Sequence, residues 1–128
     1  MKRMLIVEDD YPVREMYKAV LAGEGYEVEA ARNGLEALLR IPAFKPDLLV
    51  LDFNMPEMTG LELAGRLKAS LDPALRAIPF IVMTGESNMP PEVRAAFERN
   101  PACAAFLPKN VDVEMLARAV RSVLGGGE

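Results

Sequence analysis

The sequence contains no histidine and only one cysteine among its 128 residues. Without histidine, the chain can build neither a zinc site that needs histidine ligands nor a Ser-His-Asp or Cys-His catalytic group. It also cannot carry a phosphoryl group on a histidine of its own. A single cysteine, Cys103, cannot form an internal disulfide. This fits a reducing cytoplasm, and the simplest role of Cys103 is that of a small core side chain.

Long apolar runs, an excess of basic residues and a nucleotide-binding loop are missing as well. No segment approaches the roughly 18 consecutive apolar residues of a membrane span, and the apolar run near the N-terminus is too short for a signal peptide. The net charge of −4 argues against direct nucleic-acid binding. No Gly-x-x-x-x-Gly-Lys-Ser/Thr loop supports P-loop nucleotide binding. We therefore expect a cytoplasmic protein with no membrane span and no direct contact with nucleic acid.

The remaining composition is that of one globular domain. Hydrophobic residues make up 51% of the chain and charged residues 27%, and this length is sufficient for one core. We expect the domain to span residues 1–124 and a flexible tail to cover residues 125–128. The start at Met1 directly before the first predicted strand, and an end four residues after the last helix, favour a free-standing domain or the N-terminal domain of a longer protein.

Apolar runs alternate five times with helical patterns. The predicted strands are Met4–Val7, Glu27–Ala31, Leu48–Leu51, Phe80–Met83 and Ala105–Leu107. The first, third and fourth are continuously apolar, as buried parallel strands are, whereas the second alternates and suggests an edge strand. This βα alternation predicts an α/β fold with a parallel sheet covered by helices on both faces.

Cap residues and apolar stripes predict the helices between these strands. A stripe from Val13 to Leu21 is followed by glycine stop signals, and Asp10 before Pro12 is a cap candidate. The second predicted helix is Leu35–Ile41, capped by Asn33 with Glu36 and ending before Pro42. The others are Gly60–Leu71, opened by a Thr59/Glu62 capping box; Pro91–Arg99; and a last helix capped by Asp112.

Polar side chains follow four of the apolar runs. Glu8, Asp9 and Asp10 follow the first, Asp52 the third, Thr84 the fourth and Lys109 the fifth. Because ligands bind at the carboxyl ends of the strands in such sheets, we expect these groups to share one edge. Two like charges about 4 Å apart cost about 4 kcal/mol at an effective dielectric of 20, so the acids need a counterion. A hard divalent cation, above all Mg²⁺, suits these oxygen ligands.

Taken singly, each of these residues has a plain structural explanation. Asp52 can be a turn residue, Thr84 a cap before Gly85, Lys109 a solvated loop lysine and Phe106 ordinary core packing. Only the combination points to chemistry, in which the Asp52 carboxylate attacks phosphorus and forms an acyl phosphate. The metal and Lys109 then neutralise phosphoryl charge, and Thr84 donates a hydrogen bond.

These residues resemble the receiver domain of bacterial two-component response regulators over essentially the whole chain. LIVEDD, DFNMPEMTG, IVMTGE and FLPK are similar to four motifs of that family and occur in the same order. The resemblance implies a flavodoxin-like (βα)5 fold with strand order 2-1-3-4-5. It also implies a phosphorylation-activated switch rather than an enzyme, since such a domain catalyses only its own aspartyl phosphorylation and dephosphorylation.

The resemblance also implies residue roles. Asp52 is the phosphoacceptor, and Thr84 and Phe106 are the switch residues. Asp9, Asp52 and the Asn54 carbonyl bind Mg²⁺, with Glu8 acting through water, and Glu86 joins Asn54 in tuning the acyl phosphate lifetime. The implied partners are a sensor histidine kinase or phosphotransfer protein and a protein effector that contacts Pro91–Arg99, the fifth strand and the last helix. A monomer or weak dimer is expected.

Three features depart from the family pattern. Asn110, instead of proline, follows Lys109; Gly85 replaces the usual alanine; and the segment 88–104 is longer and lacks Ala-Gly-Ala before the fifth strand. A cis peptide before a non-proline residue costs about 2.5–4 kcal/mol, so the Lys109 loop is expected to differ.

Three other interpretations were weighed. A haloacid-dehalogenase-type phosphatase needs an acid where this chain has Asn54, and it needs a longer chain with a cap. A phosphorylation-independent module of the same fold usually loses the acceptor, the lysine or the acids, and all are present here. The chain can also be the receiver of a larger regulator or hybrid kinase.

Overall fold

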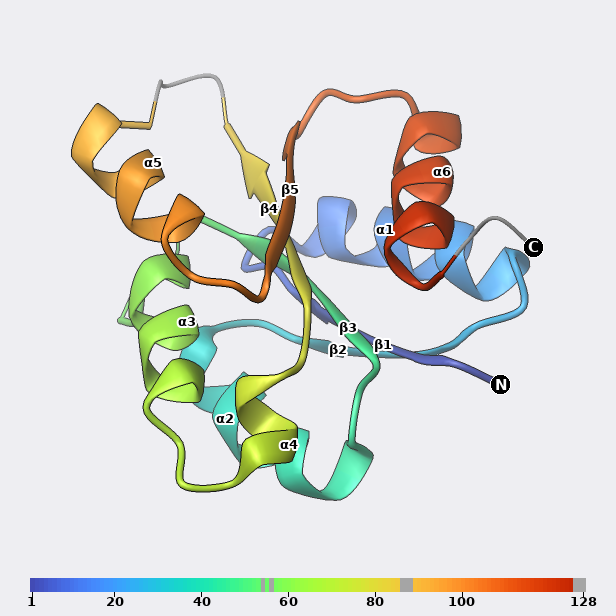
Figure 1. Cartoon of the computed structure of the whole chain (residues 1–128). Coiled ribbons are helices and arrows are strands. Elements are labelled where there is room, and N and C mark those ends of the chain that lie inside the picture. The colour runs from blue at the N-terminus through green and yellow to red at the C-terminus, as the bar shows by residue number, and fades with distance from the viewer. Residues whose placement is uncertain (54, 56, 86–88, 126–128) are drawn as a thin grey trace.

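The computed structural model describes residues 1–53, 55, 57–85 and 89–125, and it contains one five-stranded parallel sheet flanked by helices (Figure 1). The strand order is β2-β1-β3-β4-β5, as the family resemblance implied. The strands are β1 (Arg3–Val7), β2 (Glu27–Ala31), β3 (Leu48–Asp52), β4 (Phe80–Thr84) and β5 (Cys103–Pro108). Each predicted strand is confirmed to within two residues, and β2 is an edge strand as predicted.

Six helices are present among the described residues, one more than predicted. They are α1 (Tyr11–Gly23), α2 (Gly34–Phe44), α3 (Gly60–Lys68), α4 (Pro73–Arg76), α5 (Pro91–Glu98) and α6 (Val113–Val123). Because α4 is the additional helix, the fourth and fifth predicted helices correspond to α5 and α6. The predicted caps at Asp10, Asn33, Thr59 and Asp112 all accept hydrogen bonds from backbone N–H groups.

The predicted end of α2 before Pro42 is wrong, because the helix continues through Pro42 to Phe44. A proline this close to a helix end removes only one intrahelical hydrogen bond. The last turn is held from outside: Phe44 is buried, and its carbonyl accepts a hydrogen bond of 2.9 Å from the Arg3 guanidinium. Lys45 then ends the helix in the left-handed conformation, and its N–H donates to the Ile41 carbonyl.

The predicted helix Gly60–Leu71 also ends too late, because α3 stops at Lys68. A new cap starts the short helix α4 instead. The Asp72 carboxylate accepts a 2.9 Å hydrogen bond from the Ala74 N–H, and Pro73 occupies the first helical position, where its missing N–H costs nothing. The Asp72-Pro73 pair is a helix start signal in the sequence, but the prediction relied on apolar periodicity and did not use it.

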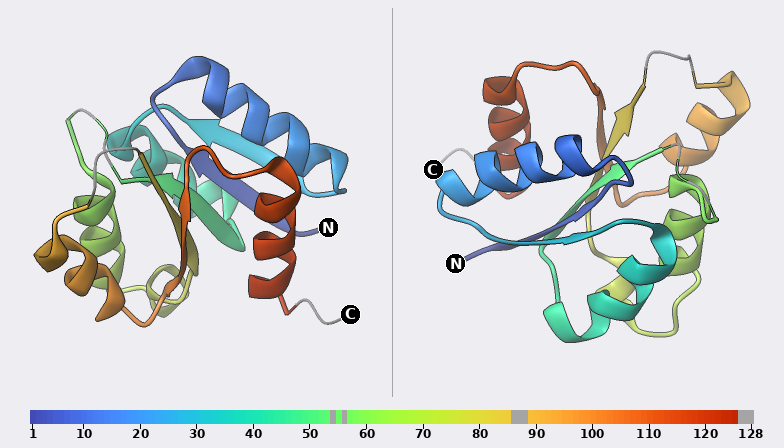
Figure 2. Two further views of the ribbon diagram at one scale, coloured as in Figure 1. Left: turned by 90° about the horizontal axis from the view of Figure 1, so that it is seen from above. Right: turned by 180° about the vertical axis from the view of Figure 1, so that it is seen from behind.

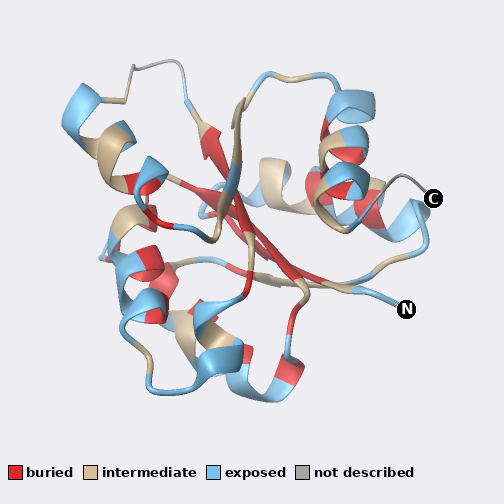
Figure 3. Cartoon of the chain, viewed as in Figure 1, coloured by how far each residue is buried: buried red, intermediate tan, exposed pale blue. Residues whose placement is uncertain are grey.

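Helices cover both faces of the sheet, α1 and α6 on one face and α2, α3 and α5 on the other (Figure 2). Alternate residues of β1, β3 and β4 supply the two apolar clusters. Their side chains are almost fully buried (Figure 3) because a parallel sheet between two helical layers has no solvent face. This rigid frame fixes the carboxyl ends of the four strands that carry the polar residues.

Candidate functional site

The carboxyl ends of β1, β3, β4 and β5 lie side by side in the sheet. Strand pairing continues to the residues at the edge, where Asp52 is aligned with Met83, and Thr84 with Pro108. The Lys109 N–H donates a 2.7 Å hydrogen bond to the Thr84 carbonyl, which extends the ladder beyond β5. The predicted gathering of Glu8, Asp52, Thr84 and Lys109 at one edge is therefore confirmed.

Three carboxylates of this edge form a candidate metal cluster. One carboxylate oxygen each of Glu8, Asp9 and Asp52 lies within 4.8 Å of the others. The side chains of Glu8 and Asp52 are only 1% and 2% exposed, whereas Asp9 is exposed. Two buried carboxylates this close repel each other strongly unless a cation lies between them. Asp10 is separate from this cluster, because its carboxylate caps α1.

Lys109 supplies a cation from within the chain. Its ammonium nitrogen lies 3.0 Å from a Glu8 oxygen and 3.2 Å from an Asp52 oxygen. Burial alone would lower the lysine pKa, but the hydrogen bond to Glu8 and the charge of Asp52 outweigh it and raise the pKa of Lys109. The predicted pairing of Lys109 with Asp52 is confirmed, and Glu8 shares the same ammonium.

The surroundings of Glu8 disfavour the ionised form of its carboxyl group. Burial, followed by the charge of Asp52, raises the pKa of Glu8 to about 7, although the hydrogen bond from Lys109 opposes the rise. One of its oxygens, Oε2, accepts from the Lys109 ammonium and the Asp10 N–H. The other, Oε1, is buried and has no hydrogen-bond partner in the described part of the chain. A buried oxygen without a donor fits a residue that faces a metal ion or its bound water.

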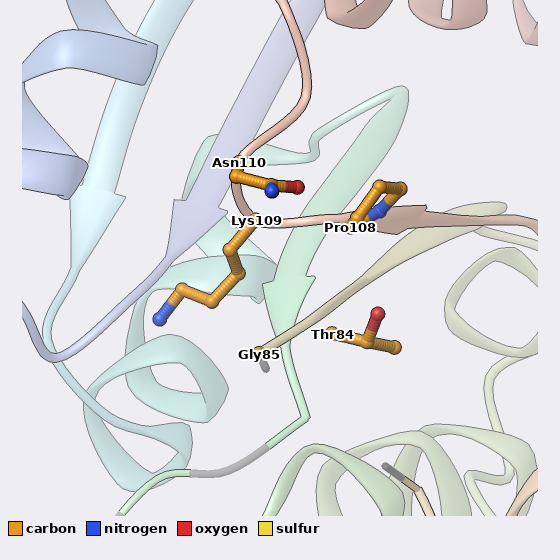
Figure 4. A pocket seen from close by; sticks show the side chains of 5 residues that line it. All are labelled: Thr84, Gly85, Pro108, Lys109 and Asn110. Carbon is orange, nitrogen blue, oxygen red and sulfur yellow. The ribbon is translucent and has the colours of Figure 1, made fainter. Parts of the chain in front are cut away.

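Thr84 does not point its hydroxyl at Asp52. The Thr84 Oγ1 donates a 3.4 Å hydrogen bond to the Leu107 carbonyl on β5 (Figure 4). Next to Thr84 lies a cavity of about 470 Å³, lined by Thr84, Gly85, Pro108, Lys109 and Asn110. Thr84 and Lys109 thus border the same open space.

Phe106 is only partly buried, so the prediction of plain core packing holds for one side of its ring. That side meets the Phe97 ring edge-on at a centroid distance of 6.0 Å. The guanidinium carbon of Arg94 lies 4.2 Å from the Phe106 ring centroid. The Arg94 contact was not predicted, because no sequence pattern links a residue of α5 to one of β5.

Gly60 was predicted only as the first residue of a helix, but the structure also constrains it at the site. A Cβ atom at this position would lie 2.6 Å from the Asp52 carbonyl oxygen and 2.5 Å from a Leu51 methyl carbon. The Gly60 N–H also donates to the Phe53 carbonyl. Glycine is therefore required because α3 begins directly against the backbone of Asp52.

Two expectations about the surrounding loops have different outcomes. The Lys109–Asn110 peptide is trans, as are all other peptides in the described ranges. Asn54 and Glu86, expected to supply a metal-binding carbonyl and to tune the acyl phosphate, lie outside the described residues.

Comparisons with known proteins agree with this fold. The family model for the response regulator receiver domain matches residues 4–121. The polar-differentiation response regulator DivK of Brucella anthropi is 35% identical over 97% of both chains. The response regulator MprA of Mycobacterium avium is 35% identical over 95% of this chain, which spans about half of MprA.

Solved structures show the same likeness. The chemotaxis response regulator CheY4 of Vibrio cholerae superimposes with a TM-score of 0.84 at 29% identity, covering 96% of this chain and 98% of CheY4. A putative response regulator from Chloroflexus aurantiacus gives a TM-score of 0.84 at 31% identity over 97% of this chain and 98% of its own. A parallel sheet of this order with acids and a lysine at its carboxyl edge defines a receiver fold. The chain belongs to the response regulator receiver family, whose members take part in two-component signalling.

No helix in the part of the chain that the structure describes has both the length and the apolar character of a membrane span.

Proposed function

We propose that the protein is a phosphorylation-activated switch of a two-component system and that Asp52 accepts the phosphoryl group. The observation that carries the proposal is the pair of buried carboxylates, Glu8 and Asp52, bridged by the Lys109 ammonium. Burying two carboxylates this close together costs stability, and groups perturbed in this way cluster at functional sites. Because this chain has no histidine, a partner histidine kinase or phosphotransfer protein supplies the phosphoryl group.

In the proposed reaction an Asp52 carboxylate oxygen forms a bond to phosphorus while the bond from phosphorus to the donor's imidazole nitrogen breaks. The imidazole leaves with the electron pair and is protonated by solvent. Lys109 moves from carboxylate pairing to a phosphoryl oxygen and stabilises its charge. The protein is not an enzyme in this scheme, since it catalyses only its own phosphorylation and dephosphorylation.

The acidic cluster fits Mg²⁺, for which Glu8, Asp9, Asp52 and the Asn54 carbonyl are the proposed ligands. When bound, Mg²⁺ offsets the carboxylate charge and the charge of the incoming phosphoryl group. The buried Glu8 Oε1, which lacks a hydrogen-bond partner among the described residues, supports this fit. We place the protein in the cytoplasm, where such kinases act, as a monomer or weak dimer.

In the proposed switch, Thr84 and Phe106 change position in response to the negative charge of the phosphoryl group on Asp52. The Thr84 hydroxyl leaves the Leu107 carbonyl and donates to a phosphoryl oxygen, and Phe106 turns into the space that Thr84 vacates. A phenyl ring can be buried there without leaving a polar atom unsatisfied. Two or three hydrogen bonds to a charged group, at about 1.5–3 kcal/mol each, are comparable with the roughly 5.5 kcal/mol that inverts a 1:99 equilibrium. The surface of α5, β5 and α6 then presents the change to a protein effector.

The acceptor is tested by incubating wild type and Asp52→Asn with acetyl phosphate and Mg²⁺ and measuring intact mass. We expect wild type to gain the mass of one phosphoryl group and the variant to gain none. A wild type that stays unmodified would point to a phosphorylation-independent interaction module instead. An equal adduct on both proteins would reject Asp52 as the acceptor.

Arg94→Ala is expected to increase the rate of phosphorylation by acetyl phosphate about two- to fivefold. The Arg94 guanidinium lies over the Phe106 ring at 4.2 Å and stabilises its outward position. A cation–π contact at an exposed site contributes about 0.5–1 kcal/mol, and its loss shifts the equilibrium toward inward Phe106 by that amount. The rate is measured by intact mass at successive times.

Glu98→Gln is the matched control for Arg94→Ala. It removes the 3.3 Å ion pair between Arg94 and Glu98 but leaves the guanidinium available to the ring. We expect its rate to stay within twofold of wild type. Equal rates for Arg94→Ala and wild type would show that the Arg94 contact does not hold the switch.

A further inference from the structure

A second cavity, of about 290 Å³, lies between α3 and α5. These helices are neighbours on the same face of the sheet (Figure 1). Its apolar wall includes Leu61 and Ala64 of α3 and Phe97 of α5. Phe97 and Ala64 are almost fully buried, so the apolar surface that a ligand can reach comes from Leu61 and Ala96.

The polar side chains that line this cavity offer donors and no carboxylate. They are Lys68, Arg99 and Asn100. Neither cation forms an ion pair with any residue in the described ranges. Asn100 is 8% exposed, and its Oδ1 already accepts a 3.0 Å hydrogen bond from the Ala102 N–H, which leaves its amide N–H group as the free function.

The nearby acids are engaged elsewhere. The Glu62 carboxylate accepts from the Thr59 N–H in the capping box of α3, and Glu98 pairs with Arg94. Lys68 and Arg99 lie at the ends of α3 and α5, where positive charge is favourable for the helix dipoles. That effect accounts for each cation separately but not for their convergence with an amide donor on one cavity.

Gly65 forms part of the same lining, and the fold has no evident need for glycine there. It lies inside α3, where glycine is about 0.5–1 kcal/mol less favourable than alanine. A Cβ atom built on Gly65 meets nothing within 4 Å, so no neighbour excludes a side chain. The absence of a side chain leaves the cavity open and the helix backbone accessible from it.

We propose that the groove between α3 and α5 binds a small organic carboxylate. Its apolar body lies against Leu61 and Ala96, over Gly65, and its carboxylate lies among Lys68, Arg99 and Asn100. The volume is near the lower limit of small-molecule sites, which suits a short aliphatic or monoaromatic acid. Charge-assisted hydrogen bonds from the two cations supply the preference for an anion.

Binding in this groove has a path to the phosphoryl site, a consequence that rests on the proposed function. The Phe97 ring meets the rings of Phe53, adjacent to Asp52, and Phe106, at centroid distances of 6.3 and 6.0 Å. A ligand in the groove therefore lies beside the helix whose buried Phe97 joins the acceptor strand to the switch residue. Any coupling between ligand and phosphorylation would be reciprocal.

The binding step is tested without phosphorylation, by titrating the isotope-labelled full chain with 4-phenylbutanoate and recording amide chemical shifts. We expect saturable shifts below about 20 mM ligand, concentrated at Leu61, Gly65, Phe97 and Asn100. The amine analogue 4-phenylbutylamine and acetate alone should give at least tenfold weaker responses. Diffuse shifts, or equal responses to the amine and the carboxylate, would overturn the proposal.

Three variants complete the test. Lys68→Gln/Arg99→Gln should weaken binding at least tenfold, the equivalent of one hydrogen bond to a charged group. Gly65→Leu should abolish binding and keep the fold, because its side chain enters open space. Arg66→Gln removes a positive charge from α3 outside the cavity lining and should bind as wild type. Unchanged affinity in the first two variants, or an equal loss in Arg66→Gln, would refute the site even though Asp52 accepts phosphoryl normally.

Discussion

Lys109→Met is expected to lower the free energy of unfolding of the metal-free protein by about 3 kcal/mol at pH 8. The Lys109 ammonium is the only cation in the described residues that pairs with Glu8 and Asp52, at 3.0 and 3.2 Å. Methionine keeps the apolar length of the side chain and removes its charge. Two nearly buried carboxylates then face each other without the Lys109 charge between them, and the folded state alone bears that repulsion.

Urea unfolding in EDTA measures this loss, and Lys18→Met is the matched control. Lys18 is exposed on α1 and forms no ion pair with a described residue, so we expect its replacement to change stability by less than about 0.5 kcal/mol. Added Mg²⁺ should stabilise Lys109→Met more than wild type, because the ion replaces the missing positive charge. Unfolding curves of Lys109→Met and wild type that coincide in EDTA would show that Lys109 does not hold the carboxylates together.

The sequence was sufficient to predict where the site lies. β1, β3 and β4 are continuously apolar because both faces of a parallel sheet are covered by helices. The βα alternation then places the carboxyl end of every strand at one edge of the sheet. Asp52 and Lys109 therefore had to lie near each other, although 57 positions separate them.

Side-chain orientation at that edge was beyond the sequence argument. The hydrogen bond from Thr84 to the Leu107 carbonyl depends on the register between β4 and β5, and several rotamers are compatible with the same strand pattern. The Arg94 contact with Phe106 depends on how α5 lies across the sheet. Such contacts join elements whose relative position is set by packing, which periodicity does not encode.

The requirement for Gly60 shows the same limit at the backbone. Its place after Thr59 indicated a helix start, but the distance of 2.6 Å between its hypothetical Cβ and the Asp52 carbonyl arises from two chain segments meeting. The helix end at Phe44 likewise depends on Arg3, a residue of another element. Local signals therefore fixed element types well and element ends less well.

Glu8→Gln is expected to stabilise the metal-free protein at pH 8 while weakening its response to Mg²⁺. The pKa of Glu8 is raised from its usual 4.5 to about 7 by burial and the charge of Asp52. The folded state therefore favours the protonated carboxyl. Its contribution to stability is fully present below about pH 4.5, falls as the pH rises, and is lost above about pH 7.

Glutamine imitates the protonated form at every pH. The stability advantage of Glu8→Gln should therefore be small below about pH 5 and grow through about pH 7, to a limit on the order of 3 kcal/mol for this shift. Urea unfolding in EDTA across this range measures the difference directly, because groups unaffected by the substitution cancel. A difference that does not change with pH would show that Glu8 titrates normally in the folded protein.

Mg²⁺ should reverse the order of the two proteins at pH 8. In wild type the metal ion relieves the repulsion between Glu8 and Asp52. It also faces Glu8 Oε1, which has no hydrogen-bond partner among the described residues. Glu8→Gln has one fewer negative charge in the cluster and gains less from the ion. The Lys109→Met substitution should also cost less in the Glu8→Gln protein, since only Asp52 of the two buried groups then remains charged. Equal stabilisation of both proteins by Mg²⁺ would show that the charge of Glu8 does not contribute to metal binding.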